Sequence, residues 1–291
     1  MKIAARGSRI ELLPLGFLLP TIALRGLVIF WPLVTGFGYS LYAGTMLKAG
    51  AFVGADNYLA LAAEPDFWHA LRFSAVFALA NVCGCYLLGS GIALLLNGEM
   101  PARGVLRVVF LLPWTVPSIV SAVAWRWLVV DANAPVNMLL GAMGIGPVYF
   151  LSSDIWAQVV VFVVKIWRSF PFMMLSLLAG LQGIDRALHE ATAIDGATRW
   201  QSFRYVTLPH LRNTSIILCI LMTIWTINDF ETPFLNTGGG SSFATKNLVE
   251  LALRYAFARN QVRPGSAVSF ITFLILAVLA IVLLRRQRSS G

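Results

Sequence analysis

The chain has 291 residues, of which 58% are hydrophobic and only 12% are charged, whereas an ordinary soluble domain carries about 25% charged residues. Its 22 basic and 13 acidic side chains leave a net charge of +9, which in a soluble protein would suggest nucleic-acid binding. The apolar residues, however, form long runs with no alternating polar face, so the composition excludes a soluble enzyme, a disordered chain and a nucleic-acid-binding domain and indicates a polytopic membrane protein.

Six apolar segments are long enough to cross a membrane, which requires about 20 residues for about 30 Å of hydrocarbon. We therefore expect one transmembrane domain over residues 1–291, all-α, with six transmembrane helices. The predicted spans are about 13–42, 72–96, 107–130, 155–180, 213–236 and 265–284. The first is long for one crossing and contains Arg25, so we expect its inner part to be tilted or interfacial. It is also too long for a signal peptide and no A-x-A site follows it, which indicates an uncleaved anchor.

The basic residues predict the orientation. With a cytoplasmic N-terminus, the inner segments hold twelve of them, namely Lys2, Arg6, Arg9, Arg103, Arg107, Arg186, Arg199, Arg204, Arg212, Arg285, Arg286 and Arg288. The outer segments hold six, namely Lys48, Arg72, Lys246, Arg254, Arg259 and Arg263. This excess predicts that both termini are cytoplasmic, although the last four of the outer residues run against the rule.

The polar segment 183–212 lies between the fourth and fifth predicted spans and is predicted to form two short cytoplasmic helices. Asp185 is a helix N-cap, and Gly196 stands where a helix ends with a left-handed residue. Thr198 and Gln201 have the spacing of a capping box, which starts a second helix. We expect Leu208-Pro209 to end that helix, because the residue before a proline is pushed out of helical geometry.

Two interpretations of this segment are open from the physics alone. Ala187, Ala191 and Ile194 share one face at helical spacing, a small apolar stripe that a partner could approach closely. The alternative is a connector on the membrane surface with no further role.

The residue identities favour the first interpretation. Glu190-Ala191-Thr192, three residues, Gly196, nine residues and then Val206-Thr207-Leu208-Pro209 resembles the EAA loop of ABC importer permeases. That pattern is E-A-A, three residues, G, nine residues and I-x-L-P, so Thr192 and Val206 are conservative departures.

Motifs along nearly the whole chain resemble the maltose-type sugar-importer permeases, the first permease subunit more than the second. They are Leu112-Pro113-Trp114, Pro117, Trp125-Arg126-Trp127-Leu128, Asn137, Trp167, Pro171-Phe172, Ala179-Gly180-Leu181-Gln182, Asp195-Gly196-Ala197, Asn228-Asp229-Phe230 and Thr237-Gly238-Gly239-Gly240. Asp185 and Ser241 stand where the family often has proline.

The resemblance implies a type I ABC importer permease fold in a bacterial cytoplasmic membrane. Two permeases would form a heterodimer in contact with membrane lipid, two ATPase subunits would dock on the EAA loops, and an external binding protein would deliver a sugar or oligosaccharide. Transport would proceed by alternating access. The implied ATPase-coupling residues are Glu190, Ala191, Asp195, Gly196 and Ala197.

ATP hydrolysis is expected in the partner chains. A Walker A loop needs a Gly-Lys pair to hold phosphate, and none of the four lysines (Lys2, Lys48, Lys165 and Lys246) follows a glycine. The chain is therefore expected to be a transport subunit and not an enzyme, without a cofactor of its own, while the ATPase subunits bind ATP and Mg²⁺.

Polar and aromatic residues recur on one face of the fourth and of the fifth predicted span. Each set has the spacing i, i+3, i+4, i+7, namely Lys165, Arg168, Ser169 and Phe172, and Met222, Trp225, Thr226 and Asp229. In the resembled maltose permease the substrate is lined by positions that align with Ser169, Phe172, Met222, Trp225, Thr226 and Asp229, and Arg168 aligns with a further lining position. The resemblance therefore implies a substrate path along these faces.

Other roles for the charges in the spans remain open, because a charge in hydrocarbon requires compensation. Arg168 and Asp229 could neutralise each other without touching substrate. Lys165 could reach the surface or pair with the second permease. Lys165 and Arg168 could also favour an anionic substrate.

No catalytic or metal constellation is predicted. His69, His189 and His210 are scattered, and Cys83, Cys85 and Cys219 are interpreted as small apolar residues. The alternatives to an importer of sugar are an importer of glycerol-3-phosphate or another polar organic solute, a stand-alone secondary transporter or channel, and an intramembrane enzyme.

Overall fold

The computed structural model of the chain describes residues 12–45, 49–98, 100–239 and 243–288. The predicted all-α class is confirmed, because the described residues form helices apart from loops and one short antiparallel pair, β1 (Tyr42–Gly44) and β2 (Ala49–Phe52). The predictions that involve Lys2, Arg6, Arg9, Lys48, Gly240 and Ser241 fall outside the described residues.

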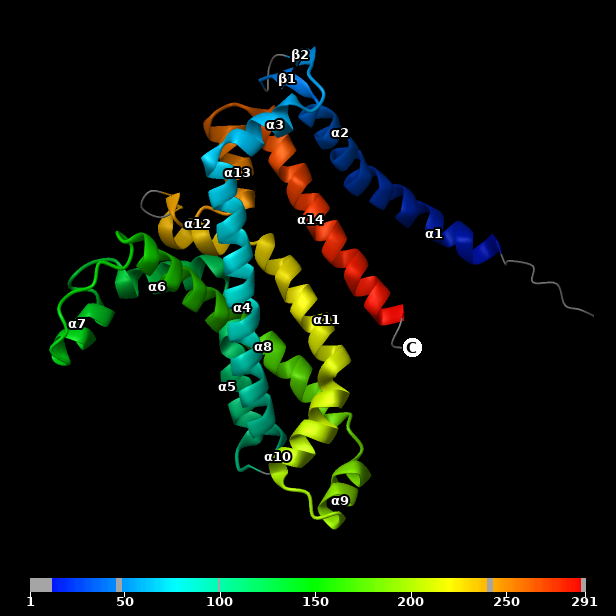
Figure 1. Cartoon of the computed structure of the whole chain (residues 1–291), viewed down its shortest axis with the longest axis vertical. Coiled ribbons are helices and arrows are strands. Elements are labelled where there is room, and N and C mark those ends of the chain that lie inside the picture. Colours follow the sequence, from blue (N-terminus) through cyan, green and yellow to red (C-terminus); the bar gives the residue numbers. More distant parts are fainter. Residues whose placement is uncertain (1–11, 46–48, 99, 240–242, 289–291) are drawn as a thin grey trace, which may run out of the picture.

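Five segments of the described chain are long and apolar enough to cross a membrane, and a bent helix pair makes a sixth. The five are Leu18–Ser40, Pro65–Asn97 (α4), Asp154–Gln182 (α8), Arg199–Ile227 and Val262–Arg286, the last within α14 (Val262–Arg288). Each predicted span therefore contains helix. The first consists of α1 (Leu12–Arg25), a π-helical turn (Gly26–Phe30) and α2 (Trp31–Ser40); α2 contacts α14, whereas α1 leans away from the other helices (Figure 1).

The predicted span over 107–130 contains a sharp bend. The segment forms α5 (Arg103–Thr115) and α6 (Ser118–Val129), whose axes differ by 92°. Val116 precedes Pro117 and is extended, with φ −71° and ψ 129°, as the clash with the proline ring requires. The helix therefore breaks at this pair and turns sharply (Figure 1).

The fifth predicted span, 213–236, is also interrupted. Helix α11 (Leu208–Ile227) ends before Asn228, and a separate helix, α12 (Glu231–Thr237), follows. The Asp229 carboxylate accepts the backbone N–H of Thr232 (3.0 Å) and so caps the first turn of α12.

The second loop helix does not end at Leu208-Pro209 as predicted. Helix α10 (Arg199–Ser202) continues through a π-helical turn (Phe203–Thr207) directly into α11. Pro209 falls in the first turn of α11, where the missing N–H and the fixed φ of proline are tolerated. The coupling segment is thus joined rigidly to the fifth span.

Three further helices and a π-helical turn of the described chain lie outside the long spans. They are α3 (Asp56–Ala63), α7 (Pro135–Ala142), α13 (Leu248–Leu253) and a π-helical turn (Arg254–Ala258). Helix α13 packs against α4 and α14 through Leu248, Leu251 and Val268.

The core lies between α4, α8 and α11, where Met173, Leu177, Leu218 and Met222 are buried together. A glycine lets α4 and α8 approach closely: a Cβ at Gly89 would lie 2.9 Å from the backbone nitrogen of Met174. Small residues serve this purpose between membrane helices, where van der Waals packing drives association.

We expect Gly89→Ala to lower the free energy of unfolding by about 1–3 kcal/mol, because the added methyl group overpacks this contact. Gly91 is the matched control on the same helix, since it is exposed and a Cβ there would meet nothing within 4 Å. Gly91→Ala should be neutral or stabilise by about 0.5–1 kcal/mol through helix propensity. Thermal unfolding in detergent measures both, and equal stability of the two variants would contradict the packing argument.

Candidate functional site

The predicted helix-turn-helix of the cytoplasmic loop is present, and its caps are those expected. Helix α9 (Arg186–Ile194) begins where Asp185 accepts the backbone N–H of Ala187 (3.0 Å). It ends in a Schellman motif, because Gly196 adopts φ +74° while Ala197 N–H donates to the Thr192 carbonyl (3.0 Å). Thr198 and Gln201 form the predicted capping box of α10.

The two loop helices are tied together on one side and open on the other. His189 and Thr192 contact the Ser202 hydroxyl at 3.2 and 3.3 Å. The candidate coupling residues lie on the open side, where Glu190, Ala191, Asp195 and Gly196 are exposed and Ala197 is half-buried. The loop projects beyond the ends of α8 and α11 (Figure 1), so the structure presents a free helical face that includes the exposed Ile194.

An aromatic group lies along the predicted path. The Phe172 ring on α8 is 4.9 Å from the Trp225 ring on α11 and 5.9 Å from the Trp114 ring on α5, measured between centroids. Trp114 and Trp225 are exposed in the chain by itself. Trp114 was not among the predicted path residues, although it stood in a quoted motif, because the approach of α5 to α8 is a tertiary contact.

Two predicted path residues on α11 point elsewhere. Thr226 is fully buried, accepts the Asn81 side-chain N–H (2.7 Å) and donates to the Met222 carbonyl (2.6 Å). Met222 is buried in the core between α4, α8 and α11. Both residues therefore hold α11 against its neighbours, and the structure does not bring them together with the exposed aromatic rings.

The charges in the spans pair differently from the predicted alternatives. Lys165 Nζ lies 2.7 Å from Asp229 Oδ2, and only 10% and 8% of the two side chains are exposed. The interpretation in which Arg168 neutralises Asp229 is thus wrong, and Lys165 does not reach the surface. Two further hydrogen bonds fix the position of Asp229. Its carboxylate accepts the Thr232 hydroxyl (2.6 Å), and its backbone carbonyl accepts the Asn247 side-chain amide (2.6 Å).

Arg168 and Ser169 are half-buried on the same side of α8. Arg168 forms no ion pair among the described residues, and its Nε is buried without a hydrogen-bond partner there. The Arg168 side chain lies one helical turn from Lys165 and one from Phe172 along α8.

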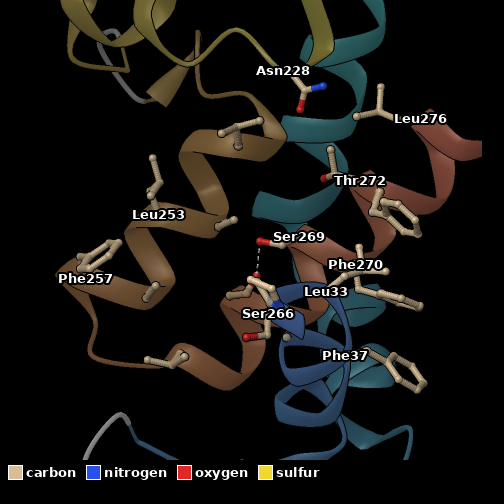
Figure 2. Close-up of a pocket in the computed structure, with 18 of the residues that line it drawn as sticks. Leu33, Phe37, Asn228, Leu253, Phe257, Ser266, Ser269, Phe270, Thr272 and Leu276 are labelled. Carbon is tan, nitrogen blue, oxygen red and sulfur yellow. Dashed lines mark hydrogen bonds between the residues drawn. The ribbon is translucent and has the colours of Figure 1, made fainter. Parts of the chain in front are cut away.

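An apolar groove of about 740 Å³ runs between α2, α13 and α14 (Figure 2). Its walls include Leu33, Phe37 and Phe270, with Ser266 and Ser269 as polar points, and Asn228 lies at one end. Sequence reasoning missed it, because α2 is far along the chain from α13 and α14 and their approach is a tertiary contact. None of the predicted path residues lines it.

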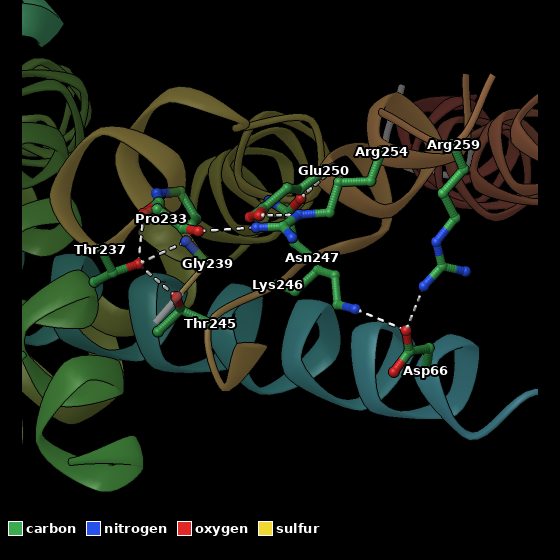
Figure 3. Close-up of polar contacts among 11 residues, drawn as sticks. Asp66, Pro233, Thr237, Gly239, Thr245, Lys246, Asn247, Glu250, Arg254 and Arg259 are labelled. Carbon is green, nitrogen blue, oxygen red and sulfur yellow. Dashed lines mark hydrogen bonds and ion pairs between the residues drawn. The ribbon is translucent and has the colours of Figure 1, made fainter. Parts of the chain in front are cut away.

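Three of the four basic residues that run against the charge rule are paired with carboxylates in a polar network (Figure 3). Lys246 is buried and pairs with Asp66 at 2.9 Å, and Arg259 approaches the same carboxylate at 3.5 Å. Arg254 pairs with Glu250 at 2.9 Å. Lys246 and Arg259 thus tie the segment that contains α13 and the π-helical turn to α4, while Arg254 links that turn to α13. Burial raises the pKa of Glu250, and the adjacent Arg254 opposes that rise.

No group of three or more metal-ligating side chains occurs in the part of the chain that the structure describes. The three cysteines are free thiols, and Cys85 donates to the Asn81 side chain (3.2 Å) in the core.

Comparison with known proteins covers almost the whole chain. Residues 86–288 match the family described as "Binding-protein-dependent transport system inner membrane component". The trehalose/maltose transport system permease protein MalF of Thermococcus litoralis is 35% identical over 277 residues, with 94% of each chain covered. The sulfoquinovosyl glycerol transport system permease protein SmoG of Agrobacterium fabrum is 30% identical, with 96% of this chain and 92% of the relative covered.

A solved structure shows the same fold. A chain of a bacterial ABC transporter involved in the import of the acidic polysaccharide alginate superposes with a TM-score of 0.81 at 21% identity, covering 96% of this chain and 94% of the other. The type I permease fold is therefore confirmed.

Proposed function

Because the chain belongs to the family of binding-protein-dependent transport system inner membrane components, and is therefore a membrane-embedded permease subunit of an ABC importer, we propose that it forms half of the translocation path for a sugar. Membership of this family supports a subunit of an ABC importer over a stand-alone secondary transporter or an intramembrane enzyme. The proposal of a sugar is supported by the relatives named for trehalose, maltose and sulfoquinovosyl glycerol.

The observation that carries the sugar proposal is the open aromatic group of Trp114, Phe172 and Trp225 beside a buried ion pair. Aromatic rings offer a flat apolar surface on which the apolar face of a sugar ring stacks. Because the three rings come from three different helices, the surface can open or close as the helices move.

The connectivity supports coupling through α9. The loop joins α8 directly to α10, and α10 continues without interruption into α11, so a force on α9 acts on both helices that carry the path. We propose that an ATPase subunit docks on Glu190, Ala191, Asp195, Gly196 and Ala197 and transmits its closure as a rigid-body motion.

The remaining subunits follow from this division of labour. A second permease completes the path as a heterodimer, two ATPase subunits bind ATP and Mg²⁺ and hydrolyse the nucleotide, and an external binding protein delivers the substrate. Docking of the ATPases on α9 requires this loop in the cytoplasm, which places both termini there too.

The proposal is tested in proteoliposomes that contain this chain with its second permease and ATPase subunits, supplied with the binding protein. We expect ATP-dependent uptake of at least one radiolabelled sugar from a set that contains maltose, trehalose and acidic sugars, with ATP supplied on the side of the membrane that the ATPase subunits face. A complex that hydrolyses ATP in response to its binding protein but takes up neither these nor other sugars would overturn the sugar assignment and leave the permease assignment intact.

Trp225→Ala is expected to reduce the affinity of the assembled importer for its sugar by about tenfold, which corresponds to about 1.4 kcal/mol of lost stacking contact. Trp225→Phe should retain most of it. Trp156→Ala is the matched control, because Trp156 is 43% exposed, against 44% for Trp225, but lies near the start of α8 and makes an edge-to-face contact with Phe150 instead of Phe172. Initial uptake rates over a range of sugar concentrations measure the effect, and equal affinity in all three variants would remove Trp225 from the path.

A further inference from the structure

Arg168 lies at the centre of α8, one of the helices that carry the proposed path. It is the middle residue of α8, which has 29 residues, so at 1.5 Å per residue it is about 20 Å from either end of the helix. Arginines near helix ends extend to the membrane surface, but one at the centre must find its compensation inside the protein.

The charge near this depth is not balanced within the described residues. Lys165 is neutralised by Asp229 at 2.7 Å. The Asp229 oxygens also accept the N–H and hydroxyl of Thr232 (3.0 and 2.6 Å). Arg168 pairs with no described carboxylate, and its buried Nε has no partner there. One positive charge on the path-lining side of α8 is therefore left over.

The surroundings of Arg168 indicate what would compensate it. One turn along α8 is Phe172, whose ring packs at 4.9 Å against the exposed Trp225, and one turn the other way is the neutralised Lys165. A guanidinium is planar and binds a carboxylate through two parallel hydrogen bonds. The combination of a stacking surface with an unpaired guanidinium fits a ring that carries an acidic group.

We propose that the transported solute is an acidic sugar, and that Arg168 binds its carboxylate while the ring stacks against Trp225 and Phe172. This inference rests on the proposed function and narrows its substrate class. Because Lys165 is already paired with Asp229, it does not compete with Arg168 for the carboxylate of the sugar. Arg168 alone therefore selects for the charge of the solute.

The test compares two probes that differ only at C6. Sodium glucuronate or glucose is titrated into the purified complete importer, and the thermal unfolding midpoint is measured. The glucose samples contain added sodium chloride, so that both series have the same sodium concentration. A ligand that binds the folded state raises this midpoint according to its affinity. We expect glucuronate to bind at least about tenfold more tightly than glucose, as one charge-assisted contact implies.

Variants assign the preference to Arg168. Arg168→Gln should reduce the ratio of the two affinities to about twofold or less, whereas Arg168→Lys, which keeps the charge, should retain part of it. Arg107→Gln is the matched control, because Arg107 also has a buried, unpartnered Nε but lies on α5 beside the core residues Leu106 and Phe110. It should leave the ratio unchanged.

Two results would overturn the inference. If glucuronate stabilises the wild-type importer no more than glucose, the Arg168 charge is compensated by protein, such as an acidic side chain of the second permease. If the preference survives Arg168→Gln, another group selects for the acid. Neither result bears on whether the importer takes up a sugar at all. That question is answered separately by ATP-driven uptake, so the two assignments can fail independently.

Discussion

Asp229→Asn is expected to lower the free energy of unfolding by about 3–5 kcal/mol, the cost of leaving a buried charge without its partner. The substitution isolates the charge, because asparagine is also a good cap and can still accept the Thr232 N–H that now bonds to Asp229 at 3.0 Å. The substitution removes the negative charge that neutralises Lys165, whose buried Nζ lies 2.7 Å from the Asp229 carboxylate. Thermal unfolding of the purified permease measures the change.

Two controls distinguish this effect from a general loss of packing. Replacing both charges in Lys165→Met/Asp229→Asn should recover most of the stability, since a neutral pair of similar volume removes the uncompensated charge. Glu64→Gln breaks an exposed pair with Arg259, 3.9 Å long and about half exposed on both sides, and should cost less than about 1 kcal/mol. A double variant as unstable as Asp229→Asn would contradict the electrostatic explanation.

Ala191→Trp is expected to abolish coupled transport, with a loss of roughly 100-fold or more in the affinity for the ATPase subunits, as a blocked interface centre implies. Ala191 lies on the open face of α9 with Ala187 and Ile194, where small side chains allow close approach. The permease itself should keep its stability, because residue 191 is exposed. Co-purification of the ATPases and ATP-driven uptake are the two measurements.

Ala191→Ser keeps the small size and should couple normally. Gly196→Ala tests the turn, because a non-glycine residue at φ +74° costs about 1–2 kcal/mol while its Cβ would meet nothing within 4 Å. Gly196→Ala should therefore reduce coupled transport only in part. Normal uptake by Ala191→Trp would show that the ATPases dock elsewhere.

The local signals of the loop could be read from the sequence because each acts over a few residues. Asp185, Gly196 and the pair Thr198 and Gln201 satisfy the free N–H and carbonyl groups of helix ends, and such groups are satisfied by neighbours in the chain. The break at Pro117 also has a local cause, but it was not predicted from the sequence, because the apolar run of 107–130 continues through the proline. At Leu208-Pro209 the proline does not end the preceding helix, because the π-helical turn before it joins α10 to α11.

The sequence by itself determined the apolar spans, the helix caps and the spacing of the coupling loop, since hydropathy and capping depend on residues close together in the chain. Only the tertiary structure decided that Lys165 is the partner of Asp229, that Trp114 joins Phe172, and that Arg168 remains unpaired among the described residues. Helical periodicity assigns each side chain to a face, but which faces meet depends on how closely the helices pack, as at Gly89, and on where they bend.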